Sequence, residues 1–159
     1  MAVFMFILNV RAVQVVLEET LGTAIAACVR GFVTQCGVPV ETRGALVLGA
    51  GFGIEVDWKC TAILHVAAML AGILAFPGTA TERMRGALYG CCAISLLNLV
   101  RIVTVFSTGL YFPDLVSIVH DVVWELIMAA STIAIWIVWV RWVRNRTTGR
   151  TDPGHMIRE

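Results

Sequence analysis

The chain has 159 residues, of which 58% are hydrophobic and 14% are charged, and its mean hydropathy is +0.84. Soluble domains have roughly 45–50% apolar and about 25% charged residues, so this composition is typical of a membrane protein and excludes an ordinary soluble domain. The net charge of +1 gives no reason to expect nucleic acid as a partner. The length allows about four membrane-spanning helices with short connections and leaves no room for a separate soluble domain.

The N-terminal region contains two apolar stretches of different character. The first, Met1–Leu17, is interrupted by polar residues and lacks both a basic start and a small-residue cleavage site. We therefore expect a short first span and not a cleaved signal peptide. The second, Thr20–Val38, contains Arg30 and Gln35. These two side chains favour an amphipathic helix at the membrane interface over another span.

A small extracytoplasmic β-hairpin is predicted next. Two short strands, Ala45–Leu48 and Ile54–Trp58, flank the glycine-rich turn Gly49–Gly53. The second strand alternates apolar and acidic residues, which is the period of a strand with one wet face. The hairpin leads directly into Cys60.

Three apolar helices are predicted after the hairpin. The first, Cys60–Phe76, ends at a Pro-Gly pair, which is a strong stop signal. The second, Met84–Phe106, is about 34 Å long at roughly 1.5 Å per residue. The third, Leu115–Val143, is about 43 Å long and should protrude from a hydrocarbon core of about 30 Å. Asp114 is expected to cap the third helix. We therefore expect an all-α integral membrane protein with about four transmembrane helices, an interfacial helix and the small hairpin.

Basic residues indicate the orientation of these helices. They cluster between Arg141 and Arg150, after the last apolar stretch, and in the loop that contains Arg83 and Arg85. The positive-inside rule places both clusters in the cytoplasm, and the start of the Cys60 helix then lies outside. We divide the chain into a membrane-embedded domain, residues 1–144, and a polar cytoplasmic tail, residues 145–159.

Cys60, Arg101 and His120 lie on three different predicted helices and at the same outer depth. A guanidinium inside the membrane costs about 2.5–3.5 kcal/mol or more unless it finds a partner or water, so Arg101 marks a candidate functional site. We expect the helix start and the nearby cation to stabilise a Cys60 thiolate as a nucleophile. His120 can exchange the thiol proton with a leaving amine, and Arg101 can stabilise an oxyanion. The three residues predict a cysteine transpeptidase site.

Three further residues are predicted to bind substrate or to support this site. Asn98 lies one turn before Arg101, and Trp124 lies one turn after His120, so we expect both to line the same pocket. Asp57 is added because it lies near the end of the predicted hairpin, just before the nucleophile. The five cysteines and three histidines show no spacing typical of a zinc site, and we predict neither a metal nor a cofactor.

Two other classes of function remain open. In one, the chain is a non-catalytic small membrane subunit or assembly factor, in which Arg101 pairs with Asp121 or Glu125. In the other it is a transporter or channel, although it has no internal repeat and no pair of Gly/Pro-interrupted helices. An accessible and reactive Cys60 thiol would favour the enzyme, and an inert one would favour the subunit.

Several segments resemble the exosortase/archaeosortase family, and they are most like its compact exosortase H type. The resemblance extends from Gly37 to Trp142. The chain departs from the family pattern in two ways: the family usually has glycine two residues after its cysteine, where this chain has Ala62, and the N-terminal region of this chain is short and polar for the family. The segments that carry the resemblance are Gly37–Val40, Val56–Cys60, Ile73–Pro77, Asn98–Ile102, and His120 with Trp124.

The resemblance implies a multi-pass cysteine enzyme of the bacterial inner membrane, with its active site on the extracytoplasmic face. It implies Cys60 as nucleophile, Arg101 as oxyanion stabiliser and His120 as acid and base. The implied partners, besides the bilayer, are membrane-anchored proteins with a C-terminal sorting signal, made of a short motif, a transmembrane helix and a basic cluster. Such enzymes cut at the motif and pass the acyl group to an acceptor.

Overall fold

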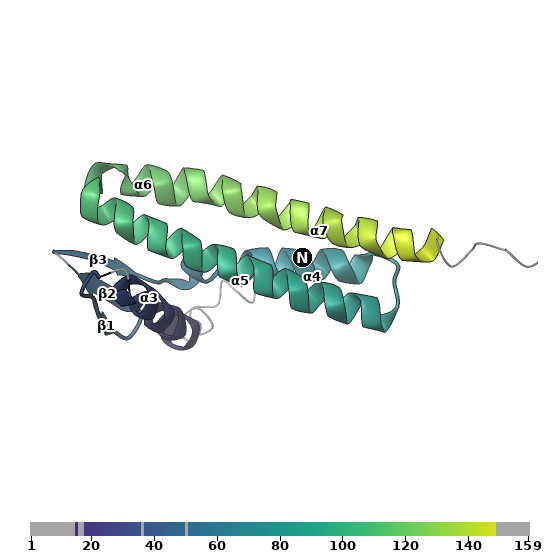
Figure 1. Cartoon of the computed structure of the whole chain (residues 1–159), viewed down its shortest axis with the longest axis horizontal. Helices are drawn as coiled ribbons and strands as arrows, with labels where there is room; N and C mark the ends of the chain where they lie inside the picture. The colour runs from purple at the N-terminus through teal and green to yellow at the C-terminus, as the bar shows by residue number, and fades with distance from the viewer. Residues whose placement is uncertain (1–14, 16–17, 36, 50, 149–159) are drawn as a thin grey trace, which may run out of the picture.

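The computed structural model describes residues 15, 18–35, 37–49 and 51–148. This part of the chain is mostly helical and contains one small sheet. Three helices, α4, α5 and α7, form an elongated bundle, and the sheet packs with α3 at one end of it (Figure 1). The predicted first span, Met1–Leu17, lies almost entirely outside the described residues.

Helix α5, Ala80–Tyr111, is the longest element of the fold. Its start is fixed by a capping box, in which the Thr79 hydroxyl accepts a hydrogen bond from the Glu82 amide and the Glu82 carboxylate binds back to Thr79. This cap explains why the helix begins before the predicted Met84. With 32 residues, α5 is about 48 Å long.

The chain then reverses and returns alongside α5. Pro113–Leu115 forms a 3-10 turn, Val116–Ile118 forms the short α6, Val119–Val123 is π-helical, and Trp124–Thr148 forms α7. Pro113 occupies the start of this return, and the Asp114 side chain makes no capping hydrogen bond. The prediction that Asp114 caps this helix was therefore wrong, because proline takes the first helical position.

Among the described residues, two helices are long and apolar enough to cross a membrane, Ala80–Tyr111 and the continuous helical stretch Pro113–Arg146. Only 33% and 22% of their most apolar stretches are buried within the described part of the chain, whereas the core helix of a soluble protein would be mostly buried. Helix α4, Ile63–Ala75, is about 20 Å long, which is shorter than a hydrocarbon core of about 30 Å. The prediction of a mostly helical chain with a small sheet is confirmed, whereas four transmembrane helices are not found among the described residues.

The sheet has three antiparallel strands in the order β1-β2-β3. They are β1, Glu41–Arg43, β2, Leu46–Gly49, and β3, Phe52–Glu55, and Val47 of β2 pairs with Ile54 of β3. The predicted hairpin is confirmed, although its turn is tighter than expected and a third strand precedes it. The predicted extension of the second strand to Trp58 was wrong, because Trp58–Thr61 forms a 3-10 turn.

Two buried clusters hold the fold together. One joins the sheet to α3, Thr23–Gln35, and to the end of α5, with Val29, Val47 and Phe106 at 0% exposure. Gly109 of α5 allows the Phe52 ring to lie against the helix backbone, where a Cβ atom would clash with that ring. The other cluster lies between α4, α5 and α7 and is formed by residues such as Met69, Ile73, Ile94 and Met128.

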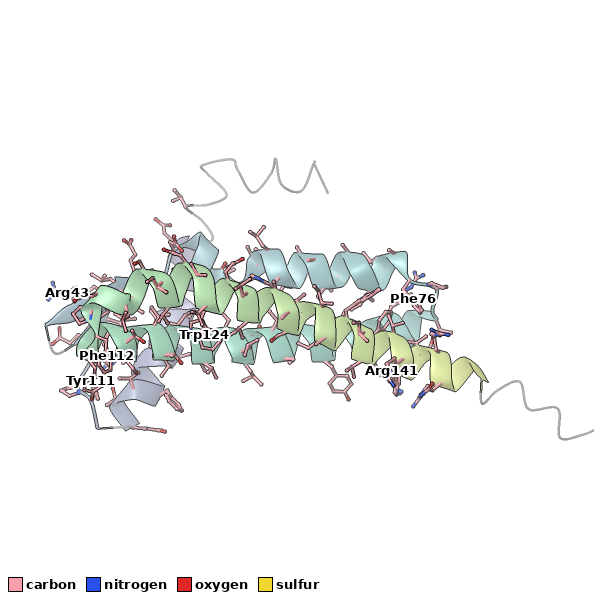
Figure 2. All side chains as sticks on the ribbon, turned by 90° about the horizontal axis from the view of Figure 1, so that it is seen from above. Arg43, Phe76, Tyr111, Phe112, Trp124 and Arg141 are labelled. Carbon is pink, nitrogen blue, oxygen red and sulfur yellow. The ribbon has the colours of Figure 1, made fainter. Side chains whose placement is uncertain are left out.

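The two ends of the bundle are distinguished by the side chains that lie there. Phe76 and Arg141 lie at one end, and Arg43, Tyr111 and Phe112 lie at the other (Figure 2). Arg83 and Arg85, which the sequence placed in a loop, lie in the first turns of α5, and Arg83 donates a hydrogen bond to the Phe76 carbonyl. They therefore gather at the same end as the arginines at the end of α7, as expected for two basic clusters on one side.

Ala62 connects the 3-10 turn to α4 in a left-handed backbone conformation, with φ 56° and ψ 15°. It is the only described non-glycine residue with a positive φ, and its side chain is 2% exposed. This conformation costs an L-residue about 1–2 kcal/mol. Glycine, which has no Cβ atom, would tolerate this positive φ without strain.

We expect Ala62→Gly to be tolerated and Ala62→Val to be strongly destabilising. The glycine variant should gain about 1–2 kcal/mol from relief of backbone strain. It should lose about 0.8 kcal/mol from the missing methyl group, and more from the greater entropy of the unfolded chain. The free energy of unfolding should therefore change by less than about 1 kcal/mol. Valine adds a branched side chain at a buried, left-handed position and should cost about 2 kcal/mol or more. Thermal unfolding of the full chain in detergent measures both, and a valine variant as stable as wild type would contradict the strained turn.

Candidate active site

Cys60 lies in the 3-10 turn Trp58–Thr61, before α4 begins. Asp57 caps this turn, and its Oδ1 accepts a hydrogen bond from the Cys60 amide at 2.9 Å. Cys60 is 8% exposed and belongs to the buried cluster that contains Ile102 and Phe106. The expectation that Cys60 opens its helix was therefore wrong, because Ala62 interrupts the backbone and the helix starts after it.

The structure brings Cys60 and His120 into direct contact. The Cys60 Sγ lies 3.1 Å from His120 Nε2, and His120 Nδ1 lies 2.7 Å from Asp121 Oδ1. If Nδ1 donates to the carboxylate, Nε2 is left free to accept the thiol proton. Cysteine, histidine and aspartate thus form a chain of nucleophile, base and orienting acid. Residues 119–123 form a π-helical turn, an irregularity that is frequent at functional sites.

Arg101 of α5 is 2% exposed and holds this histidine segment from the other side. Its Nη2 donates to the His120 carbonyl at 3.4 Å, and its Nη1 lies 3.8 Å from Glu125 Oε2. Glu125 also lies near His65, at 3.7 Å between Oε1 and Nε2. Within the described part of the chain, Nε and Nη1 of Arg101 make no hydrogen bond. Buried guanidinium N–H groups without an acceptor are candidates for binding a ligand oxygen.

Asn98 supports the site by fixing the backbone of the nucleophile. Its Nδ2 donates to the Cys60 carbonyl at 2.7 Å, and the side chain is 3% exposed. One face of α5 therefore fixes both halves of the site, because Asn98 binds the cysteine turn and Arg101 binds the histidine turn one helical turn later.

Trp124 does not line the cavity beside Cys60. It is 8% exposed and packs in the cluster between α4, α5 and α7, together with Ala62 and Met128. Neither Trp124 nor Asn98 lines this cavity. Trp124 packs in the core, whereas Asn98 supports the site through its hydrogen bond to the Cys60 backbone.

The catalytic candidates surround a cavity of about 30 Å³. This space is enough for a water molecule but not for a peptide segment, so a peptide can enter only if the walls separate. Larger hollows of about 710 and 600 Å³ lie elsewhere on the molecule, and neither contains Cys60 or His120. The residues that line the small cavity are Ile54, Glu55 and Val56 of the sheet region, with Cys60, Arg101, Ile102, Val105 and His120.

The surroundings of Cys60 favour the neutral thiol. Burial raises the pKa of Cys60 to about 12, the nearby Asp57 carboxylate adds to this increase, and the Arg101 guanidinium opposes it more weakly. The thiol is therefore protonated at neutral pH, which corrects the expectation of a ready-made thiolate. A base is needed to deprotonate it, and His120 Nε2 lies within hydrogen-bond reach.

Asp121 is a site residue that the sequence reasoning considered only as a partner for Arg101. The sequence shows His120 and Asp121 side by side, but adjacent side chains of a regular helix do not face each other, so their pairing was not expected. The pairing depends on the irregular helix at this point, which the sequence does not reveal.

A comparison of the chain with protein-family models, with curated proteins and with solved structures finds no match. The interpretation of the site depends on the geometry of its own residues. Within the described residues, no group of three or more His, Cys, Asp and Glu side chains is placed to hold a metal ion.

We expect Asp57→Asn to increase the alkylation rate of Cys60. Asparagine is as good a cap as aspartate, so the turn should persist, while loss of the carboxylate lowers the pKa of Cys60. Below both pKa values the thiolate fraction rises tenfold for each unit by which the pKa falls, so a severalfold faster reaction with iodoacetamide is expected at about pH 8. Mass spectrometry of the Cys60 peptide gives the rate, and the exposed Cys92 is the internal control. An unchanged or slower rate at Cys60, with Cys92 unaffected, would contradict this account of the thiol.

Proposed function

We propose that the chain is a membrane-embedded cysteine-type transpeptidase or peptidase. One observation carries the proposal: the Cys60 Sγ lies 3.1 Å from a histidine whose other ring nitrogen binds a carboxylate, and a buried arginine with unsatisfied N–H groups lines the same cavity. Nucleophile, base, orienting acid and oxyanion donor are the parts that acyl transfer through a thioester needs.

In the proposed reaction, His120 Nε2 takes the proton of the Cys60 thiol as the sulfur attacks the scissile carbonyl carbon. The S–C bond forms, and the carbonyl electron pair moves to oxygen to give an oxyanion. When the oxyanion collapses, the C–N bond breaks and the leaving amine takes the proton from His120. The thioester on Cys60 is then resolved by an acceptor nucleophile or by water, which gives a transferred or hydrolysed product.

Arg101 is assigned to the oxyanion because its guanidinium is fixed and keeps its charge throughout the reaction. Its contacts with the His120 carbonyl and with Glu125 hold the group in place before substrate arrives. Such preorganisation avoids reorientation of donors during the reaction, and loss of one oxyanion donor typically costs about 10²–10³ in rate. Asp57 disfavours the thiolate, because its carboxylate raises the pKa of Cys60.

Because of the two apolar helices and the family resemblance, we place the proposed enzyme in a membrane. The basic end of the bundle would face the cytoplasm, and the opposite end, with the cysteine site, would face the extracytoplasmic side of a bacterial inner membrane. The proposed substrates are exported proteins with a C-terminal sorting signal, cut where the signal emerges from the bilayer.

The alternative, a non-catalytic assembly subunit, expects Arg101 to pair with Asp121 or Glu125 and expects an inert Cys60 thiol. The 3.8 Å contact between Arg101 Nη1 and Glu125 Oε2 and the burial of Cys60 are compatible with this alternative. The 3.1 Å contact between Cys60 Sγ and His120 Nε2 favours the enzyme, because an assembly subunit does not need a thiol held against an imidazole.

We expect Cys60→Ala and Arg101→Ala to abolish the processing of exported proteins. The first change removes the nucleophile, and the second removes an oxyanion donor and should slow the reaction by about 10²–10³. Arg101→Lys should also lose most activity, because an ammonium group does not reproduce the planar guanidinium. Native cells that lack the gene are complemented with each variant, and the C-terminal peptides of exported proteins are quantified by mass spectrometry.

Cys92→Ala is the matched control, because it removes an exposed thiol of α5 that does not line the cavity. It should process substrates like wild type. Equal amounts of each variant in the membrane exclude a defect in folding. Normal processing by Cys60→Ala would refute the enzyme, and normal processing by Arg101→Lys would show that charge alone is sufficient at this position.

A further inference from the structure

A second candidate binding site lies at the basic end of the bundle, away from the cysteine. It is a groove of about 600 Å³ between α4, α5 and α7. Its walls are mostly apolar and include Ile135, Val138 and Trp139 of α7. A volume of this size is in the range of small-molecule sites.

Two glycines of α5 shape the floor of this groove. Gly86 and Gly90 are buried one turn apart on α5, and both line the groove. A Cβ atom at Gly86 would clash with the Trp139 indole, and one at Gly90 would lie 2.6 Å from Met69 Cε. The Trp139 indole is also fixed by a hydrogen bond of 3.1 Å from its Nε1 to the Glu82 carbonyl. The floor of the groove is therefore formed by close helix packing.

The open end of the groove is positively charged. Arg85 and Arg146 are both exposed and line it, while no carboxylate lines it in the described part of the chain. The Arg146 guanidinium carbon lies 4.4 Å from the centre of the Trp142 ring, which holds the charge at the entrance. Tyr89 adds a further aromatic side chain to the groove. Two cations above an apolar channel match an anionic head group joined to a hydrocarbon chain.

The length of the groove matches one leaflet of a bilayer. On α7 it extends from Arg146 to Ile135, which is about 16 Å at 1.5 Å per residue. Half of a hydrocarbon core of about 30 Å is about 15 Å. A transmembrane helix would require a groove through both leaflets, and the basic cluster of a sorting signal would be repelled by the two arginines.

We propose that this groove binds one anionic phospholipid from the leaflet at the basic end of the bundle. Arg85 and Arg146 hold the phosphate-bearing head group, and one acyl chain lies along Gly86, Gly90 and Trp139. The inference does not depend on the proposed enzyme activity, because none of the groove residues belongs to the cysteine site.

Native mass spectrometry of the full chain, released from detergent with added lipid, tests this inference. The probes are phosphatidylglycerol and phosphatidylcholine with identical acyl chains, so they differ in the charge of the head group. Wild type should retain one phosphatidylglycerol in preference to phosphatidylcholine. Arg85→Gln and Arg146→Gln should each weaken this retention by about fivefold, the usual effect of one basic residue near an anionic lipid.

Matched variants distinguish lipid binding in the groove from lipid binding elsewhere on the surface. Arg141→Gln removes an exposed arginine of α7 that does not line the groove, and it should leave retention unchanged. Ala93→Trp fills the groove and should abolish retention, while Leu96→Trp, at an exposed position of α5, should not. Cys60→Ala should bind lipid like wild type even if it abolishes processing.

Equal retention of the two lipids by wild type would overturn the proposal. Undiminished retention by the Arg85→Gln/Arg146→Gln double variant would also overturn it, and so would undiminished retention by a folded Ala93→Trp. Thermal unfolding of each variant without lipid shows that it is folded.

Discussion

The site depends on the burial of one guanidinium. Arg101 is 2% exposed, and it lies between the His120 carbonyl and the Glu125 carboxylate. Because a buried charge is costly when unpaired, these groups must stay close to α5, and the π-helical turn that carries His120 is held with them. Asn98, one helical turn earlier, holds the Cys60 backbone in the same way. Two polar side chains on one face of α5 thus set the distance between the thiol and the imidazole.

In the proposed enzyme, the packing that assembles the site would also keep it inactive in the absence of substrate. Burial and the Asp57 carboxylate raise the pKa of Cys60 to about 12, so the nucleophile is a neutral thiol, and the adjacent cavity of about 30 Å³ excludes a peptide. A bound substrate would have to separate the sheet from the helices before it could reach the sulfur. A closed, protonated thiol is protected from oxidation and from adventitious electrophiles, as the proposed reaction with a docked peptide would require.

The sequence was sufficient to predict that Cys60, Arg101 and His120 would meet, because the polarity of the loops sets the direction of each helix and therefore the depth of each residue. It also predicted a helical chain with a small hairpin. The positive φ of Ala62 could not be predicted, and it moves Cys60 out of α4. Asp121 was missed as the partner of the imidazole, because regular helical spacing separates adjacent side chains. The protonation state of Cys60 follows from tertiary burial, which helical periodicity does not specify.

The most direct test of the central claim is to look for an acyl group on Cys60. The protein is isolated from its native membrane at acidic pH, where thioesters persist, and the Cys60 peptide is analysed by mass spectrometry with and without hydroxylamine. The account predicts a hydroxylamine-labile acyl adduct on this sulfur that ends at the cut site of the substrate and is absent from Cys60→Ser. Substrate processing in wild type with no acyl group on Cys60, or with the acyl group on another residue, would contradict it.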